Sequence, residues 1–515
     1  MSTQTSDNNK RIAKNTLFLY FRMLFMMAIS LYTNRVVLDK LGVTDFGIYN
    51  VVGGVVVMLG FLSGCMSNSV QRYLSYELGK NNKDGVNRVF NVALVAHGCI
   101  AIFVFLVMET VGLWYLNMCM NIPETRVNAA NWVFQCSLLT TIFTIMQVPY
   151  NAIIVSKEKM GIYAYISILE VSLKLLVVYI LAIGNYDRLK LYGVLIMLVT
   201  IGVLMVYRIY CIRKFEEAKF RYVKDWNLFK ELLSFSGWNM LSEVAWTFTG
   251  PGVNLILNAF YGPVVNAARG LAEQVNGAVS RFVQNFQTAV NPQLIKLYAA
   301  DEMEEMTKLL FRSTRFSYFL LFTLSLPLIF EMDYILHVWL KVVPQYTTEF
   351  CQLILICSLV SVNSTLLPKI AWAYGKIRNY QIIVSVVLFL NFPLSYIILK
   401  IGFSPLATTY VAIFIQLLII WTRLYLVSKM VHLSKLRYFR EVLLKNFIVT
   451  IVAVAFPTII KLFIGESFGG FLSMIVVSVI SALLSSYFLG MEANERTLVV
   501  NVVNKGIKKI TNNKI

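Results

Sequence analysis

Long apolar runs follow each other along almost the whole chain, separated by short polar segments. A helix that crosses the roughly 30 Å hydrocarbon core of a membrane needs about 20 mainly apolar residues. A window of about 19 residues finds about fourteen such runs. They cover residues 15–37, 46–69, 90–113, 128–155, 162–183, 190–211, 232–257, 264–292, 316–336, 350–373, 380–400, 404–427, 443–463 and 468–489. The pattern predicts an all-α integral membrane protein with about 14 transmembrane helices.

The second part of the chain repeats the first. Matching residues recur in the same order about 220 positions later, at equivalent depths in the predicted spans. Examples are Asn34 with Asn254, Pro149 with Pro368, and Arg208 with Arg423. Each copy holds six spans, an even number, so the two copies have the same orientation and form a parallel repeat. Such repeats are a transporter design, with the substrate site between the repeats and access that alternates between the two sides.

The repeat predicts three parts of the chain. An N-lobe covers residues 1–225 with spans one to six, and a C-lobe covers 226–440 with spans seven to twelve. Residues 441–515 stand outside the repeat and hold spans 13 and 14, followed by a basic cytoplasmic tail.

Composition and charge agree with a membrane protein. Hydrophobic residues make up 58% of the chain and charged residues only 14%, whereas about 25% of a soluble protein is charged. The net charge of +19 would indicate nucleic-acid binding in a soluble protein. However, about 33 of the 46 Lys and Arg residues fall on the side of the membrane that holds both termini. The positive-inside rule makes that side the cytoplasm, so we expect no nucleic-acid partner.

Span eight carries a stripe of polar residues along its whole length. Its members recur every three or four residues, which places them on one face of a helix. They are Asn266, Arg269, Glu273, Asn276, Ser280, Gln284, Gln287 and Asn291. Lipid would penalise such a face, so it must contact protein or water. A polar seam between packed helices is one interpretation. The wall of a water-filled cavity is the one we favour, because the stripe extends through both leaflets.

Charged residues inside the spans are further candidates for function. On insertion scales each central charge costs at least about 2.5–3.5 kcal/mol, so it needs a partner or water. Glu170 and Lys174 lie one turn apart in span five, and we expect a structural ion pair there. Glu243 and Glu273 are candidates for coupling to an ion or for ion pairing.

Four in-span arginines are hypothetical ligands for an anionic head group, because guanidinium forks match phosphate geometry. They are Arg22, Arg35, Arg269 and Arg281. Structural ion pairing is the alternative, and the residues alone leave both open. The three histidines are far apart, and no pair of the seven cysteines has CxxC spacing, so we expect no metal site and no cofactor.

No motif indicates an enzyme. Walker A, HExxH and GxSxG sequences are absent from the chain. We therefore expect a transporter driven by an ion gradient, by the membrane potential or by consumption of its substrate on the far side.

Three stretches resemble bacterial polysaccharide flippases of the Wzx type, which serve O-antigen, capsule or exopolysaccharide assembly. They are "LYTNRVVLDKLGVTDFGIYNVVGGVVVML", "VPYNAIIVSKEKMGIYAYISILEVSLKLL" and "HVWLKVVPQYTTEFCQLILI". These flippases belong to the multidrug/oligosaccharidyl-lipid/polysaccharide exporter (MOP) superfamily. The resemblance implies two six-helix lobes in a V around a central cavity, plus two extra C-terminal helices that form a groove for a lipid tail. It also implies cavity-lining cations in spans one, two, seven and eight, a placement that the four arginines match by span.

The same resemblance implies a function in cell-surface polysaccharide or lipopolysaccharide biosynthesis. The cargo would be a polyprenyl-diphosphate-linked oligosaccharide, flipped from the cytoplasmic to the periplasmic leaflet of the bacterial inner membrane. Membrane lipid and other polysaccharide-assembly membrane proteins would be its partners.

Two alternatives stay open. The first is a cation-coupled exporter of drugs or metabolites from the same superfamily, for which Glu243 and Glu273 could serve. The second is a membrane glycosyltransferase or polysaccharide polymerase, for which the short outer loops offer little support.

Overall fold

The computed structural model describes the greater part of the chain. The described residues are 12, 14–29, 32–33, 36–37, 40–41, 45, 48–49, 52, 61–118, 122–181, 187–221, 223–340, 343–463, 467–493 and 495–497. Within these ranges all regular secondary structure is helical. The predicted all-α class is therefore confirmed.

Ten helical stretches of the described part are long and apolar enough to cross a membrane. They are Lys83–Met118, Glu124–Ser156, Met160–Ile180, Arg188–Lys214, Met303–Trp339, Thr347–Tyr374, Arg378–Lys400, Ala407–Val431, Lys435–Lys461 and Phe468–Gly490. These ten match predicted spans three to six and nine to fourteen. The protein is thus a multi-pass membrane protein.

The other four predicted spans differ in what the structure shows of them. Spans 15–37 and 46–69 lie partly outside the described residues. Spans 232–257 and 264–292 fall on two further helices, α8 (Trp226–Thr247) and α9 (Val253–Ala299). In α9 the polar stripe lowers the mean hydropathy, so this long helix does not stand out by apolar composition.

The chain folds into two compact units. Unit 1 comprises Met1–Glu243, Thr288–Met303 and Trp372–Gln381, and unit 2 comprises Val244–Gln287, Glu304–Ala371 and Ile382–Ile515. Residues 441–515, predicted as a separate C-terminal segment, are grouped with unit 2.

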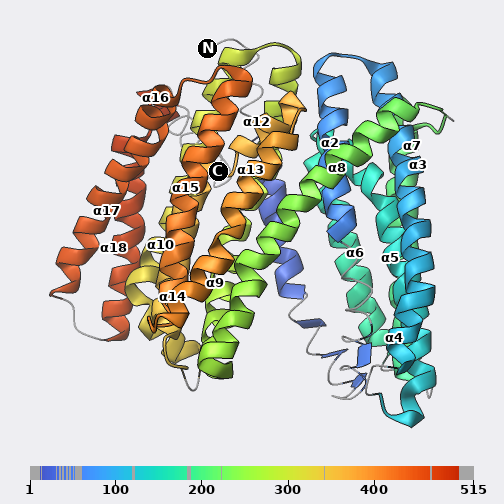
Figure 1. Cartoon of the computed structure of the whole chain (residues 1–515), viewed down its shortest axis with the longest axis horizontal. Helices are drawn as coiled ribbons and strands as arrows, with labels where there is room; N and C mark the ends of the chain where they lie inside the picture. The colour runs from blue at the N-terminus through green and yellow to red at the C-terminus, as the bar shows by residue number, and fades with distance from the viewer. Residues whose placement is uncertain are drawn as a thin grey trace, which may run out of the picture. The chain divides into compact units, whose positions relative to one another are not determined.

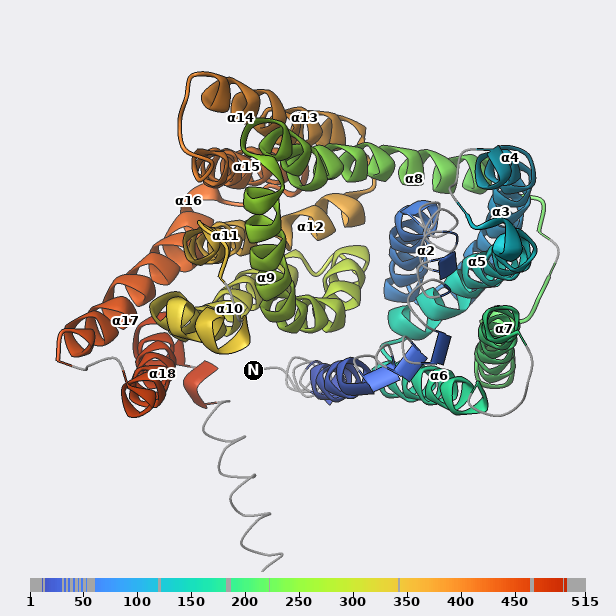
Figure 2. The same cartoon turned by 90° about the horizontal axis from the view of Figure 1, so that it is seen from below.

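Unit 1 is a bundle around one central helix. Its main helices are α2 (Phe61–Gly79), α3 (Lys83–Val107), α5 (Val127–Ser156), α6 (Met160–Ile180) and α7 (Arg188–Lys214), coloured blue to green in Figure 1. Helix α5 contacts the other four, and Figure 2 shows the bundle end-on. Side-chain caps begin two of the helices: the Asn82 Oδ1 accepts from the Gly85 N–H for α3, and Asp187 accepts from the Leu189 N–H for α7.

The predicted ion pair in α6 is present. The Lys174 Nζ lies 2.6 Å from a carboxylate oxygen of Glu170, one turn earlier in the helix. Both side chains are about one-third exposed, at 37% and 29%. Because the two charges neutralise each other within one helix, this pair is structural, as the spacing predicted.

Unit 2 contains most of the helices of the second repeat together with the two C-terminal spans. They are α10 (Met303–Trp339), α11 (Thr347–Ser361), α12 (Leu367–Tyr374), α13 (Arg378–Phe389), α14 (Asn391–Lys400), α15 (Ala407–Val431), α16 (Lys435–Tyr438), α17 (Lys445–Lys461) and α18 (Phe468–Ser485). The first residue of α10, the last three residues of α12 and the first four residues of α13 are grouped with unit 1. One apolar core holds Leu321 of α10, Leu355 of α11, Val449 of α17 and Ala482 of α18, all buried.

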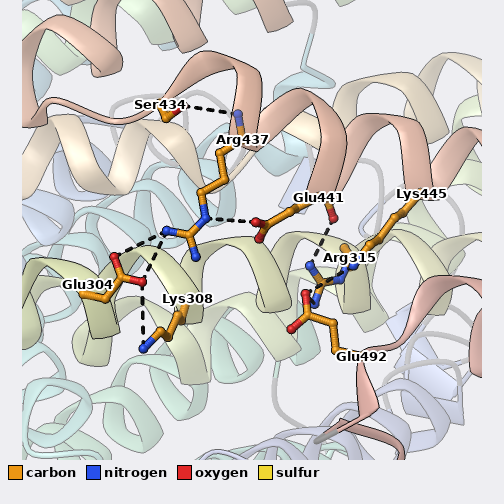
Figure 3. Close-up of polar contacts among 8 residues, drawn as sticks. All are labelled: Glu304, Lys308, Arg315, Ser434, Arg437, Glu441, Lys445 and Glu492. Atoms are coloured by element: carbon orange, nitrogen blue, oxygen red, sulfur yellow. Dashed lines mark hydrogen bonds and ion pairs between the residues drawn. The ribbon is translucent and has the colours of Figure 1, made fainter.

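A network of charged residues also ties the C-terminal helices to α10 (Figure 3). The Arg315 guanidinium on α10 is 2% exposed and lies 2.5 Å from a Glu495 oxygen and 3.3 Å from a Glu492 oxygen. It also donates to the backbone carbonyl of Glu441 at 3.0 Å. Removing one partner of a buried ion pair leaves the other charge uncompensated and is costly, so these contacts hold the ends of spans 13 and 14 against α10.

Candidate functional site

The helix that carries the polar stripe is α9, whose 47 residues contain one break. Gly262 adopts a φ of 77°, outside the helical range, and the surrounding space is open, with no atom within 4 Å of the position a Cβ would take. A residue with a side chain would disfavour that backbone. The break separates a short first segment from the long second segment that begins before Arg269.

A cavity of about 110 Å³ lies within unit 2, beside the second segment of α9. Three consecutive stripe residues line it: Arg269, Glu273 and Asn276. Further polar side chains come from other segments, namely Thr249 just before α9, Cys357, Ser358 and Ser361 of α11, Asn391 of α14, and Thr409 and Gln416 of α15. Ile354, Leu388 and Ile415 add apolar surface. The cavity is therefore a hollow within unit 2 that is lined by both polar and apolar side chains.

Arg269 is the most unusual group in this wall. Its side chain is buried, at 5% exposure, yet its Nε and Nη1 have no hydrogen-bond partner among the described residues. Glu273 lies one turn later on the same helix, close enough to interact electrostatically with Arg269. A buried guanidinium with unused donors is costly unless a further acceptor occupies the space beside it. The geometry is that of a site able to accept an anionic or carbonyl group.

Asn276, in the cavity wall, forms a hydrogen bond to a residue of α11. Its Oδ1 accepts from the Ser358 hydroxyl at 2.7 Å and from the Ser280 hydroxyl at 3.3 Å. The Ser358 bond holds α9 against α11 at the level of the cavity, whereas the Ser280 bond lies within α9 and orients the Asn276 side chain.

The stripe changes its role toward the end of α9. The Gln287 amide donates to the Thr365 hydroxyl at 2.7 Å and to the Ser317 hydroxyl at 3.2 Å, which is a polar seam between packed helices. Gln284 is exposed. Asn266 belongs to α9, but its side chain lies outside the described residues. Within the described residues, both interpretations of the stripe thus apply, each to a different part of the helix.

The other candidates that the structure describes do not line this cavity. Arg22 stacks over the ring of Tyr163 in unit 1, with the guanidinium carbon 4.4 Å from the ring centroid. Arg281 is exposed on α9, and Glu243 is exposed near the end of α8. Arg35 lies outside the described residues. Of the four arginines, the structure therefore places only Arg269 on the described cavity of unit 2. Three or more metal-ligating side chains do not gather anywhere in the described part of the chain.

Sequence reasoning missed the half of the site that α11, α14 and α15 supply. One sequence signal pointed to this wall: Ser358 and Ser361 are spaced by three residues and therefore share a helix face. Asn391 and Gln416 occur singly in apolar runs. Only the packing of distant helices shows that they face the same hollow.

Comparisons with known proteins give the fold. The MatE family model matches residues 19–180, less than half of the chain. No curated protein sequence matches the chain. Solved structures match over most of its length.

Three of these structures illustrate the likeness. A multidrug resistance MATE family transporter of the MOP superfamily, in an outward-facing conformation, has 11% identity and a TM-score of 0.69, covering 82% of this chain and 96% of its own. The Vibrio cholerae MATE transporter VcmN in the bent form has 14% identity and a TM-score of 0.70, covering 84% and 98%. The MATE transporter ClbM in complex with Rb⁺ has 15% identity and a TM-score of 0.68, covering 84% and 97%. The chain therefore has the fold of the MATE transporters.

Proposed function

We propose that this chain is a secondary transporter that exports its substrate by alternating access, with the cavity beside Arg269 and Glu273 as a binding site. The observation that carries the proposal is the buried Arg269 guanidinium, whose Nε and Nη1 lack partners within the described residues. Structural side chains in a membrane interior are normally satisfied, so unused polar groups on a cavity wall mark a substrate or ion path. The MATE fold supports the same class of function.

The first candidate cargo is a small molecule, exported in exchange for a cation. The comparisons support this candidate more directly than the flippase, because a solved structure with the same fold is described as a multidrug resistance transporter and another is in complex with Rb⁺. Glu273 supplies the carboxylate that such coupling needs, since it lines the cavity and is exposed. Protonation or cation binding there would change the charge beside Arg269.

The second candidate cargo is a polyprenyl-diphosphate-linked oligosaccharide. Arg269 favours it, because unused guanidinium donors fit a diphosphate oxygen. The three stretches that resemble Wzx-type flippases support it as well. Under this candidate, the partners are the lipid-linked glycan, membrane lipid and other polysaccharide-assembly proteins.

A binding experiment on purified protein distinguishes the two cargoes. A small cationic dye and a polyprenyl-diphosphate-linked saccharide are each titrated against the wild type, Glu273→Gln and Arg269→Gln. For the first candidate, we expect dye binding that Glu273→Gln weakens. For the second, we expect binding of the lipid-linked saccharide that Arg269→Gln weakens. Arg281→Gln is the matched control, because Arg281 is an exposed arginine on the same helix outside the cavity wall. Equal binding by all variants would exclude the cavity as the site.

Localisation in a bacterial inner membrane with both termini in the cytoplasm also belongs to this proposal. It is supported by the bias of Lys and Arg toward one side. Labelling of single cysteines placed in opposite loops, with a reagent that cannot cross the membrane, tests the orientation.

A further inference from the structure

A second cavity, of about 610 Å³, lies within unit 1 and is strongly basic. Three segments far apart in the sequence line it: the later part of α2 at Arg72, the beginning of α8 at Lys230, and the turn 375–378 between α12 and α13. All three lie in loops, or at helix ends beside loops, that the charge count predicts to be cytoplasmic. This cavity is separate from the one beside Arg269, which lies in unit 2.

The charges around this cavity do not balance. Four cationic side chains line it, and one carboxylate, Glu231, opposes them. The cations are Arg72, Lys230, Lys376 and Arg378. Within the described part of the chain, Lys230, Lys376 and Arg378 form no ion pair with a carboxylate. The excess of positive charge makes the cavity attractive to an anion.

Arg72 forms a fixed part of the wall. Its side chain is 7% exposed, its Nε donates to the Trp372 carbonyl at 2.7 Å, and its Nη2 donates to the Ala373 carbonyl at 3.1 Å. Gly375 follows with a φ of 93°, and a Cβ there would lie 2.5 Å from the Arg72 Nη2. Glycine therefore lets the turn approach the guanidinium closely. The two carbonyls orient Arg72 without neutralising its charge.

Aromatic rings hold two of the other cations in place. The Arg378 guanidinium carbon lies 5.2 Å from the centroid of the Trp238 ring, and the Lys230 Nζ lies 5.5 Å from that of Trp226. Cation–π contacts orient a charged group while leaving donors for another ligand. Phe235, which is buried, adds apolar surface to the same wall.

We propose that this cavity binds a phosphate ester, with the phosphate held by Lys376, Arg378 and Lys230. Guanidinium and ammonium groups together are the usual ligands of phosphate oxygens. A volume of about 610 Å³ falls in the range of ligand pockets and exceeds what a phosphate alone fills. The organic substituent of the ester packs against Trp238 and Phe235. The same chemistry serves a soluble phosphate compound and the headgroup of an anionic lipid.

Calorimetric titration of the purified full-length protein in a neutral detergent tests the proposal. One arm uses a soluble phosphate monoester, glycerol 3-phosphate, and the other uses a short-chain phosphatidic acid. We expect the wild type to bind at least one of them, and binding to weaken at least about tenfold in the double variant Lys376→Gln/Arg378→Gln, because two charge-assisted contacts are lost. Binding of glycerol 3-phosphate indicates a soluble phosphate ester, and binding of phosphatidic acid alone indicates a lipid headgroup.

A matched control removes two other lysines that lie on an aromatic ring. Lys429 and Lys435 both lie 4.6 Å from the ring of Tyr425 in unit 2, outside this cavity. We expect Lys429→Gln/Lys435→Gln and Arg269→Gln to keep wild-type binding, which separates this site from the proposed cargo site. Failure of the wild type to bind in both arms would overturn the proposal. So would equal binding by the Lys376→Gln/Arg378→Gln variant, provided that its thermal unfolding midpoint shows it to be folded.

Discussion

Glu158 provides a quantitative test of how the end of α9 is held in unit 1. Its side chain is 1% exposed, in the turn between α5 and α6. One carboxylate oxygen lies 2.5 Å from the Lys296 Nζ, and the other accepts from the Gln293 amide. Its backbone is left-handed, with a φ of 59°. Substitution at this position therefore affects a buried ion pair and a strained backbone at once.

The loss of the ion pair and the relief of backbone strain change the stability of a glycine variant in opposite directions, so the two can be separated. Removing one partner of a buried ion pair costs about 3–5 kcal/mol. Because Lys296 is 20% exposed and can regain some water, we expect the lower end, about 3 kcal/mol, for Glu158→Ala. The left-handed conformation costs a non-glycine residue about 1–2 kcal/mol. Glu158→Gly should therefore be more stable than Glu158→Ala by about 1 kcal/mol.

The free energy of unfolding, measured by denaturant titration in detergent micelles, checks both numbers. Asp301 provides the control, because its φ of 61° is also left-handed while its side chain is exposed. We expect Asp301→Ala to change stability by less than about 0.5 kcal/mol. If Glu158→Ala cost no more than Asp301→Ala, the ion-pair argument would be refuted. A glycine variant less stable than the alanine variant would refute the backbone argument.

Three further predictions concern the rest of the chain. Glu495→Gln should lower the free energy of unfolding by about 2–3 kcal/mol, because it leaves the buried Arg315 guanidinium with less compensating charge; an unchanged denaturant midpoint would argue against this. Gly402→Ala should cost about 1 kcal/mol in the same titration, since a φ of 98° disfavours a side chain although the space is open; no loss would mean that the turn relaxes freely. Burial is the largest single effect on the Glu217 carboxyl and raises its pKa, but the hydrogen bond from Lys157 at 2.8 Å, a backbone hydrogen bond and the positive charges of Lys157 and Lys83 together outweigh burial, so the net pKa is lowered. The stabilisation by the ionised Glu217 is therefore present above about pH 4.3, the pKa of an unfolded Glu, and is lost as the pH falls through the folded pKa. Lys157→Gln should make the unfolding midpoint fall less steeply between about pH 5 and 3, and an unchanged slope would contradict the role given to the Lys157–Glu217 pair.

Much of the fold could be predicted from the sequence, because membrane helices are encoded locally. An apolar run of sufficient length predicts its helix without reference to other parts of the chain. The Glu170–Lys174 pair was predictable for the same reason, since both partners lie one turn apart on one helix. The polar stripe of α9 was also visible in the sequence as a spacing of three and four.

The composition of the two cavities could not be predicted in this way. The wall opposite Arg269 comes from α11, α14 and α15, which lie far from α9 in the sequence. Arg72 attracted no attention in the sequence because it lies beyond the apolar part of its predicted span, where a basic residue is ordinary. Only its hydrogen bonds to the carbonyls of residues 372 and 373 show that it is a fixed part of a cavity wall. Tertiary packing decides which polar residues meet, and spacing within one helix carries no information about it.

The central claim is that the cavity of unit 2 is the transport site. Its most direct test is the rate of substrate transport by the protein reconstituted in lipid vesicles under an imposed cation gradient. We predict that Glu273→Gln and Arg269→Gln each lower the rate at least about tenfold, because both remove a charge from the cavity wall. Arg281→Gln should keep the wild-type rate. Wild-type transport by both cavity variants, with protein present in equal amounts, would contradict the account.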